Sequence, residues 1–582
     1  MEPPRRGTDA LALLAWGAGP VLLARFPWAV AVLPALGVLR GPLGAVLLAV
    51  AAAAALVRLA GGERRRSPPG PWLLFLVALA AYVLTGLHYA SRLQVSGDEP
   101  HYLLMAQSLG REGDLDLEDN FAREDWREYT PGPLAAHYGT PRRDGRPYPA
   151  HSPGLSLLLA PAYAGGGRPA CIVLLALLGA LVVVEARRLA LRLTADPRAA
   201  FVAGAASAGP PLCFYAFHVY TEVPSALCLV ASLNRLLAAP GAAGAGLAAF
   251  LAACLPWLHV KMIPAAAALG VVALVRLEGR ARVAFVLVAG AMAVGYLGYY
   301  QHVFGRPTPL ALYGGLPEDA RSSPVAALVG LLLDRSFGLL PHAPVFLVAL
   351  AGLGPLARRW RDAWPCLLVG AAVLAPVLTW RMWWGGQCPP GRFLVPLVPF
   401  LAAALAVRIA EPWPGIARWR SALLGLGLAL AAFMVWDPAR LLLLNRAGRP
   451  ARVWAALSGE APVARYLPSL TRPDANEVRV AGLWGLGIVL VLLLDGRARG
   501  RLRGEECYRG LALPVLLLLG IGVGVDAWGR AGPGRDEGRG RAPSALGAGN
   551  AEGRGAGGPR CPSSTDAGAS GPSRAGCTGR RG

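Results

Sequence analysis

Long apolar segments, each ending near a cluster of arginines, recur along most of this 582-residue chain. A helix needs about 20 mostly apolar residues to cross a hydrocarbon core of roughly 30 Å. The segments reach this length repeatedly, and only 16% of the residues are charged, against roughly 25% in soluble proteins. The sequence therefore predicts an all-α integral membrane protein and excludes a soluble one.

The formal net charge of +22 raises the question of nucleic acid binding. The basic residues, however, gather at the ends of apolar segments, as at Arg64 to Arg66 and at Arg358, Arg359 and Arg361. Such an excess of positive charge marks the cytoplasmic loops of membrane proteins. We therefore predict no nucleic acid partner, contacts with membrane lipids, and a multi-pass protein of a bacterial inner membrane.

The apolar segments predict about 13 to 15 transmembrane helices. Two are expected within residues 10–60, and the others at 72–92, 169–190, 199–218, 223–239, 245–259, 262–276, 283–301, 343–357, 364–380, 393–409, 420–436, 481–495 and 510–526. Several are short, such as 245–259, so we expect some of them to be tilted, broken or re-entrant.

This threading places the arginine clusters on one side and the polar loops on the other. The clusters lie at 187–198, 276–282, 358–361, 408–420 and 497–503. The loops on the extracytoplasmic side are 93–152, 220–222, 302–342, 380–392 and 437–479. Because functional residues concentrate on loops held by a rigid scaffold, we expect the chemistry on that side.

The chain divides into four predicted parts. They are an N-terminal transmembrane hairpin (1–66), a core with the external loop 93–152 (67–410), a C-terminal transmembrane region with the external loop 437–479 (411–529), and a tail (530–582). The loop 93–152 is expected to carry juxtamembrane helices. The tail is rich in Gly, Arg, Ser and Pro and has few large apolar residues, which predicts disorder. The nine cysteines form no CxxC pair, so no metal site is predicted from them.

An acidic pair, Asp98-Glu99, follows the span at 72–92 and precedes His101 and Tyr102. A carboxylate at a membrane boundary can accept a proton from an acceptor hydroxyl, so Asp98 is the candidate general base and Glu99 its candidate catalytic partner. The alternative is that the pair only caps the next helix. Two carboxylates could also hold a divalent cation, although two alone are weak evidence.

Further candidate residues lie on the other external loops. His151, in the Pro-rich segment 147–155, turns the chain back toward the membrane, or it is merely part of a loop-to-span junction. Arg381 and Arg392 flank a tryptophan-rich loop, and an arginine fork matches phosphate oxygens, although headgroup snorkelling is the alternative. The only lysine, Lys261, and Glu222 lie at hairpin tips and either contact ligand or pair with each other.

The order of these motifs resembles that of C-type membrane glycosyltransferases of the protein O-mannosyltransferase and aminoarabinose-transferase branch, over roughly residues 70–410. The resemblance rests on Asp98-Glu99, on the segment His151 to Leu155, and on the run Gly391-Arg392-Phe393-Leu394-Val395-Pro396. It implies transfer of a sugar from a polyprenyl-phosphate donor to an acceptor on the outer face, with inversion and with Asp98 as base. From their chemistry and their place on the external loops, we expect the lipid phosphate or the sugar to be bound by His101, Tyr102, His151, Glu222, Lys261, Arg381 and Arg392.

Two other functions fit part of the sequence. A transporter or flippase of lipid-linked sugars would also place Lys261 and Glu222 along its path, but it would be expected to show internal repeats, and we find none. A scaffold without catalytic activity would use the external loops only to bind a partner. The sequence leaves the acceptor open between a lipid, a glycan and a protein.

Overall fold

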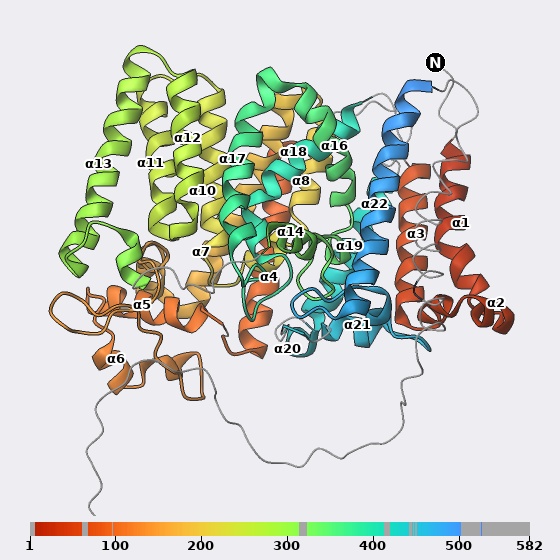
Figure 1. Cartoon of the computed structure of the whole chain (residues 1–582), viewed down its shortest axis with the longest axis horizontal. Helices are drawn as coiled ribbons and strands as arrows, with labels where there is room; N and C mark the ends of the chain where they lie inside the picture. The colour runs from red at the N-terminus through yellow and green to blue at the C-terminus, as the bar shows by residue number, and fades with distance from the viewer. Residues whose placement is uncertain are drawn as a thin grey trace, which may run out of the picture. The chain divides into compact units, whose positions relative to one another are not determined.

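A computed structural model describes residues 6–60, 68–95, 97–313, 323–411, 419–441, 445, 447–448, 451–501 and 525, which lie in a compact unit, Met1–Ala531. The regular structure of these residues is helical, apart from an isolated bridge between Tyr138 and Pro149. The prediction of an all-α protein is therefore confirmed (Figure 1). The arginine cluster at 64–66, most of the expected span 510–526 and the tail lie outside the described residues.

Most of the described helices follow one another with short connections; longer ones precede α7 and η5. Those before α7 are α1 (Arg6–Leu23), α2 (Pro27–Val32), η1 (Pro34–Arg40), α3 (Pro42–Ala60), α4 (Pro71–Arg92), α5 (Glu99–Arg111), α6 (Glu118–Ala122) and η2 (Asp125–Glu128). The next are α7 (Gly154–Thr194), α8 (Pro197–Ser207), α9 (Leu212–Tyr215), α10 (Glu222–Leu237), α11 (Ala242–Leu258), η3 (Val260–Met262), α12 (Ile263–Arg276), α13 (Gly279–Phe304) and η4 (Pro309–Tyr313). The last are α14 (Pro324–Leu333), α15 (Leu339–His342), α16 (Phe346–Arg358), α17 (Trp360–Thr379), η5 (Arg392–Leu397), α18 (Val398–Ala410), α19 (Arg420–Trp436), α20 (Pro438–Leu441), α21 (Arg452–Leu457), η7 (Val463–Tyr466) and α22 (Ala475–Arg501).

Six stretches of the described chain are helical, long and apolar enough to cross a membrane, and the bent pair of η1 and α3 would make a seventh. The six are Pro71–Arg92, Gly154–Thr194, Gly279–Tyr313, Trp360–Thr379, Arg392–Ala410 and Ala475–Asp495. Shorter apolar helices include α11, α14, α16 and α19. The expected number of 13 to 15 spans stays a prediction, because many expected spans correspond to helices below the length of a full crossing.

Two expected spans compare differently with the structure. The helix expected at 169–190 agrees with the second part of α7, which resumes after Gly166 and Gly167 leave helical geometry, but the first part, from Gly154, was not expected. Gly167 has φ +60° and ψ −151°, a conformation that only glycine adopts readily. The continuous helix expected at 199–218 is wrong, because α8 ends at Ser207 and is followed by Pro210-Pro211, which lack the N–H groups that a helix needs.

The arginine clusters meet at one end of the bundle, as the threading predicts. Contacts join them directly: Arg276 donates to the carbonyl of Arg361 (3.1 Å), Arg359 to that of Leu193 (2.8 Å), and ion pairs connect Arg358 with Glu411 (3.8 Å) and Arg408 with Asp495 (2.8 Å). The opposite end carries α5, α6, α20 and α21 (Figure 1). There the loop 93–152 bonds to α13 and η4 through Arg143 and Thr140, whose N–H groups donate to the carbonyls of Val303 and Leu312.

Alanine and glycine let the central helices approach closely. α7 packs against α4, α8, α10 and α18, and a cluster of buried alanines joins α7, α8 and α18: Ala186, Ala190, Ala199, Ala200, Ala203, Ala402 and Ala406. Membrane helices use such small residues because lipid supplies no hydrophobic force to press helices together. The core that positions the site is thus a tight helical bundle centred on α7.

Two glycines of α16, which crosses α18, allow this close packing to be tested by substitution. Gly352 faces the backbone of Ala404 so closely that an added Cβ would overlap its carbonyl group, whereas a Cβ on Gly354 would meet nothing. We expect Gly352→Ala to lower the free energy of unfolding by roughly 1–3 kcal/mol through overpacking. Gly354→Ala, two residues further on the same helix, is expected to leave it unchanged or slightly higher. Thermal unfolding in detergent measures both, and equal melting of the two variants would contradict the close crossing.

Candidate functional site

Four charged side chains from four separate segments meet at the end of the bundle that carries the polar loops. Arg392 is their centre: its Nη2 donates to Asp98 (2.8 Å), and its Nε donates to Glu222 (3.1 Å). Lys261 Nζ donates to the same oxygen of Glu222 (2.9 Å). We call Asp98, Glu222, Lys261 and Arg392 the charge cluster. All four are residues that the sequence predicts for the site, and the expected pairing of Glu222 with Lys261 is present.

Glycines make room for Arg392 and for the turn before Asp98. Gly385 has φ +91°, its carbonyl accepts from Arg392 Nη1 (2.7 Å), and an added Cβ would lie 2.7 Å from the Arg392 side chain. Gly97 has φ +62°, and a Cβ there would lie 2.5 Å from the hydroxyl of Tyr220. Both positions need a left-handed backbone and space for a neighbour, which only glycine provides without strain. The local sequence thus shapes the loops around the arginine.

Asp98 is the accessible member of the charge cluster. Its side chain is 32% exposed, whereas those of Arg392 and Glu222 are 8% and 0% exposed. Burial acts to raise the pKa of Asp98, but the adjacent Arg392 guanidinium and then His151 hold that pKa well below its usual range. Asp98 is therefore a carboxylate at neutral pH. It begins α5, yet its side chain accepts no capping hydrogen bond, so the alternative that it merely caps this helix is not supported.

Aromatic rings lie against both cations. The guanidinium of Arg392 lies 4.1 Å from the ring centre of Tyr220, and Lys261 Nζ lies 4.0 Å from that of Phe393. Cations are stabilised over aromatic faces, more so where water is excluded. Neither ring was singled out in the sequence, although Phe393 directly follows Arg392. Together they keep two positive charges next to buried carboxylates.

Three histidines stack beside Asp98. The ring of His101 lies 4.0 Å from that of His137 and 5.5 Å from that of His151, and His151 lies 4.7 Å from the ring of Tyr102. Burial lowers the pKa of His101 to about 3 and that of His151 to about 4. Both imidazoles are therefore neutral at pH 7, and the buried Nε2 of His151 has no hydrogen-bond partner in the described part of the chain. His137 was missed because nothing in its local sequence marks it.

Glu99 has a different environment from Asp98. It is 1% exposed, and its two oxygens accept from the Tyr89 hydroxyl and the Val219 N–H, both at 2.9 Å. Through these bonds Glu99, at the start of α5, connects α4 with the segment before α10; its predicted catalytic role stays a prediction. No group of three or more His, Cys, Asp and Glu side chains suited to a metal ion is found in the described ranges. The predicted divalent cation at Asp98 and Glu99 is not tested by this observation.

The two arginines expected to bind one anion have different surroundings. Arg381 is exposed at the start of the tryptophan-rich loop, and Arg392 is buried at its end. Each nitrogen of the Arg392 guanidinium donates to a protein oxygen. Its anions in this structure are thus the protein's own carboxylates. The ammonium group of Lys261, whose one hydrogen-bond partner among the described residues is Glu222, keeps donors for a ligand.

The histidine stack predicts an acid-sensitive fold. The pKa values of His101 and His151 lie below the roughly 6.5 of an unfolded chain, so the unfolded chain binds more protons between about pH 6.5 and 4. Stability is then full above pH 6.5 and is lost as the pH falls toward 4. We expect His101→Gln to flatten this dependence in thermal unfolding at pH 7 to 4.5. His302→Gln, exposed on α13, is the control, and parallel curves for both variants would contradict the prediction.

The chain was compared with known proteins. No family model and no curated protein matches it. Similar solved structures are ArnT from Cupriavidus metallidurans in the apo state (TM-score 0.42, 17% identity, 78% of this chain and 75% of that one) and ArnT bound to undecaprenyl phosphate (0.41, 17%, 78% and 76%). An oligosaccharyltransferase from Archaeoglobus fulgidus is also similar (0.39, 14%, 68% and 57%). At these identities and with TM-scores below 0.5, the likenesses assign neither a family to this chain nor a role to any of its residues.

Proposed function

We propose that this protein is a membrane glycosyltransferase, which moves a sugar from a polyprenyl-phosphate donor to an acceptor on the extracytoplasmic face. The charge cluster is the observation that carries this proposal. It combines a partly exposed carboxylate with two cations at the end of a membrane bundle, where a lipid headgroup and a soluble or lipid acceptor can meet. The opposite end holds the arginine clusters, which mark the cytoplasmic side.

The roles of the charged groups follow from their accessibility. Asp98 faces outward, so it can receive the proton of the acceptor hydroxyl or amine as that atom bonds to the anomeric carbon. The bond from this carbon to the phosphate oxygen breaks at the same time, and the lipid phosphate leaves with the electron pair. Lys261 has donors left for this phosphate. Arg392, bonded on every nitrogen, holds Asp98 and Glu222 in place.

We infer that the reaction needs no divalent cation at Asp98 and Glu99. Both oxygens of Glu99 already accept hydrogen bonds, and Asp98 is paired with Arg392, so the pair offers few free ligands for a cation that prefers six or more oxygens. Turnover measured before and after EDTA treatment is expected to be the same. A loss that Mg²⁺ or Ca²⁺ restores would overturn this inference.

The function is tested by sugar release in nanodiscs. Purified protein is given a panel of radiolabelled polyprenyl-phosphate sugars with an extract of envelope lipids, glycans and proteins as acceptors. Consumption of one donor, with the label appearing on an acceptor and the lipid phosphate released, is expected. If no donor is consumed but labelled lipid moves across the membrane of proteoliposomes, a transporter of lipid-linked sugars replaces the transferase. If no donor is consumed and none moves across the membrane, both the transferase and the transporter are refuted.

A further inference from the structure

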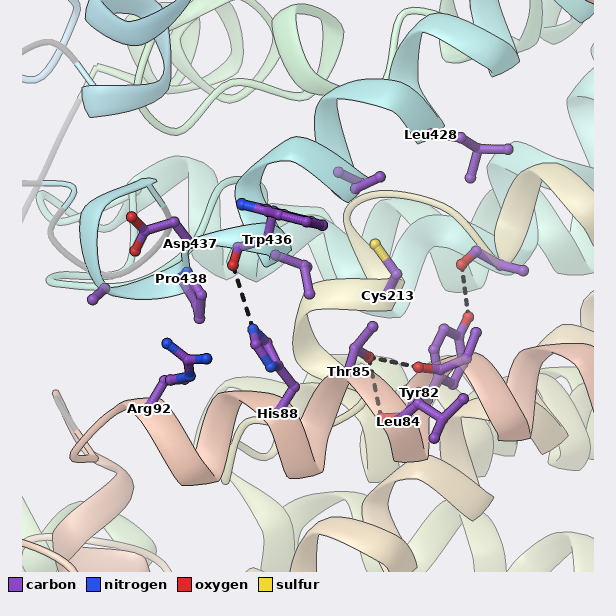
Figure 2. A pocket seen from close by; sticks show the side chains of 16 residues that line it. Tyr82, Leu84, Thr85, His88, Arg92, Cys213, Leu428, Trp436, Asp437 and Pro438 are labelled. Atoms are coloured by element: carbon purple, nitrogen blue, oxygen red, sulfur yellow. Dashed lines mark hydrogen bonds between the residues drawn. The ribbon is translucent and has the colours of Figure 1, made fainter.

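A groove between α4 and α19 lies apart from the charge cluster. It has a volume of about 920 Å³ and runs along the outer face of α4 past Tyr82, Thr85 and His88 (Figure 2). This is within the range of roughly 300–1,000 Å³ found for small-molecule sites. The opposite wall is α19 with the start of α20, and the floor is the segment that contains Ala208 and Cys213.

Most of the groove is apolar, and several of its side chains are exposed. Leu84 is 69% exposed, Leu428 is 44% exposed and Trp436 is 82% exposed. The polar groups along its length are satisfied within the protein: the Tyr82 hydroxyl donates to the carbonyl of Ala208 (2.8 Å), and the Thr85 hydroxyl donates to that of Ala81 (2.7 Å). A hydrocarbon chain is therefore the kind of group that this wall can accommodate.

One end of the groove is charged. His88, Arg92 and Asp437 lie together there, beside Trp436 (Figure 2). The His88 ring donates to the carbonyl of Trp436 (3.4 Å), which ties the end of α4 to that of α19. Arg92 makes no hydrogen bond or ion pair with any residue that the structure describes, and Asp437 uses a single oxygen, which accepts from the Arg440 N–H (3.3 Å). A cation and an anion thus remain available at the mouth of an apolar groove.

We propose that this groove binds a zwitterionic glycerophospholipid with a primary ammonium group, its acyl chain along the apolar walls, its phosphate on Arg92 and its ammonium on Asp437. Arg92 is positive and Asp437 is negative, so together they complement a headgroup that carries both charges. An anionic headgroup would fit less well, because Asp437 would repel it. Trp436 is typical of the headgroup level. The proposal goes beyond the proposed function and does not depend on it, because no member of the charge cluster lines the groove.

Native mass spectrometry of the delipidated, full-length protein in detergent tests the proposal. Phosphatidylethanolamine, phosphatidylcholine and phosphatidylglycerol are added at equal concentrations, and the bound lipid is counted. We expect phosphatidylethanolamine to be retained most, because choline cannot donate a hydrogen bond to Asp437 and phosphatidylglycerol lacks the ammonium. The double variant Arg92→Gln/Asp437→Asn is expected to retain it about a hundredfold more weakly, the effect of losing two charge-assisted hydrogen bonds.

A steric variant tests the groove itself. Ala432 lines it from the exposed side of α19, so Ala432→Trp should fill the groove and abolish the retained lipid without disturbing the buried core. Ala293→Trp, equally exposed on α13 but outside the groove, is the matched control and should retain lipid like the wild type. Equal retention of all three lipids, or equal retention by Ala432→Trp and Ala293→Trp, would overturn the proposal.

Discussion

Asp98→Asn is expected to lower the rate of sugar transfer by about 10²- to 10⁴-fold, the usual contribution of a general base. The amide has nearly the shape of the carboxylate but cannot take up the acceptor proton. Its oxygen can still accept a hydrogen bond from Arg392, and the guanidinium keeps its hydrogen bonds to Glu222 and to the carbonyl of Gly385. The variant should therefore fold, and the loss should appear mainly in kcat rather than in KM for the donor.

The control for this substitution is Asp144→Asn, on the same loop. Asp144 is 48% exposed and pairs with Arg142 at 3.5 Å, so we expect wild-type activity from it. Thermal unfolding of both variants checks that the fold is intact. If Asp98→Asn transfers sugar at the wild-type rate, Asp98 only positions Arg392, and His151, whose buried Nε2 has no partner among the described residues, becomes the base to be tested next.

That the arginine clusters lie together at one end of the helical bundle could be predicted from the sequence. Arginine clusters at helix ends carry this information on their own, and the contacts of Arg276, Arg359 and Arg408 confirm that the clusters share one end. The lengths of the helices were harder to predict. Apolar composition does not distinguish α8, which stops before Pro210, from a helix that continues, and it does not show that α7 begins as early as Gly154.

The membership of the charge cluster was also predictable, because ionisable residues are rare and costly near a membrane. Lys261 and Glu222 were chosen for that reason, Asp98 as a carboxylate that can accept a proton and Arg392 as a fork for phosphate, and the structure brings the four together. Their pairing was not predictable, since contacts across 294 positions of sequence depend on the packing of the whole bundle. For the same reason the sequence did not show that Glu99 has surroundings different from those of its neighbour Asp98. It also did not place His137 beside His101.

Arg392→Gln is expected to lower the free energy of unfolding by roughly 3–5 kcal/mol, the usual cost of removing one partner of a buried ion pair. Glu222 is fully buried and would keep Lys261 alone as its cation, while Asp98 would lose its partner. Arg392→Lys keeps the charge but loses the fork that bonds both carboxylates, so an intermediate loss is expected. Arg381→Gln, on the exposed part of the same loop, should change stability by about 0.5 kcal/mol or less.

Thermal unfolding in detergent measures this series, and a double variant identifies the cause. If the excess negative charge left in the cluster, Asp98 and Glu222 against Lys261 alone, is what destabilises Arg392→Gln, then adding Glu222→Gln removes one of the two negative charges and should recover part of the loss, a coupling that independent sites do not show. Lys261 would then lack its partner, so full recovery is not expected. Additive losses in the double variant would mean that Arg392 stabilises the fold through its contacts with Gly385 and Tyr220 rather than through the charge of Glu222.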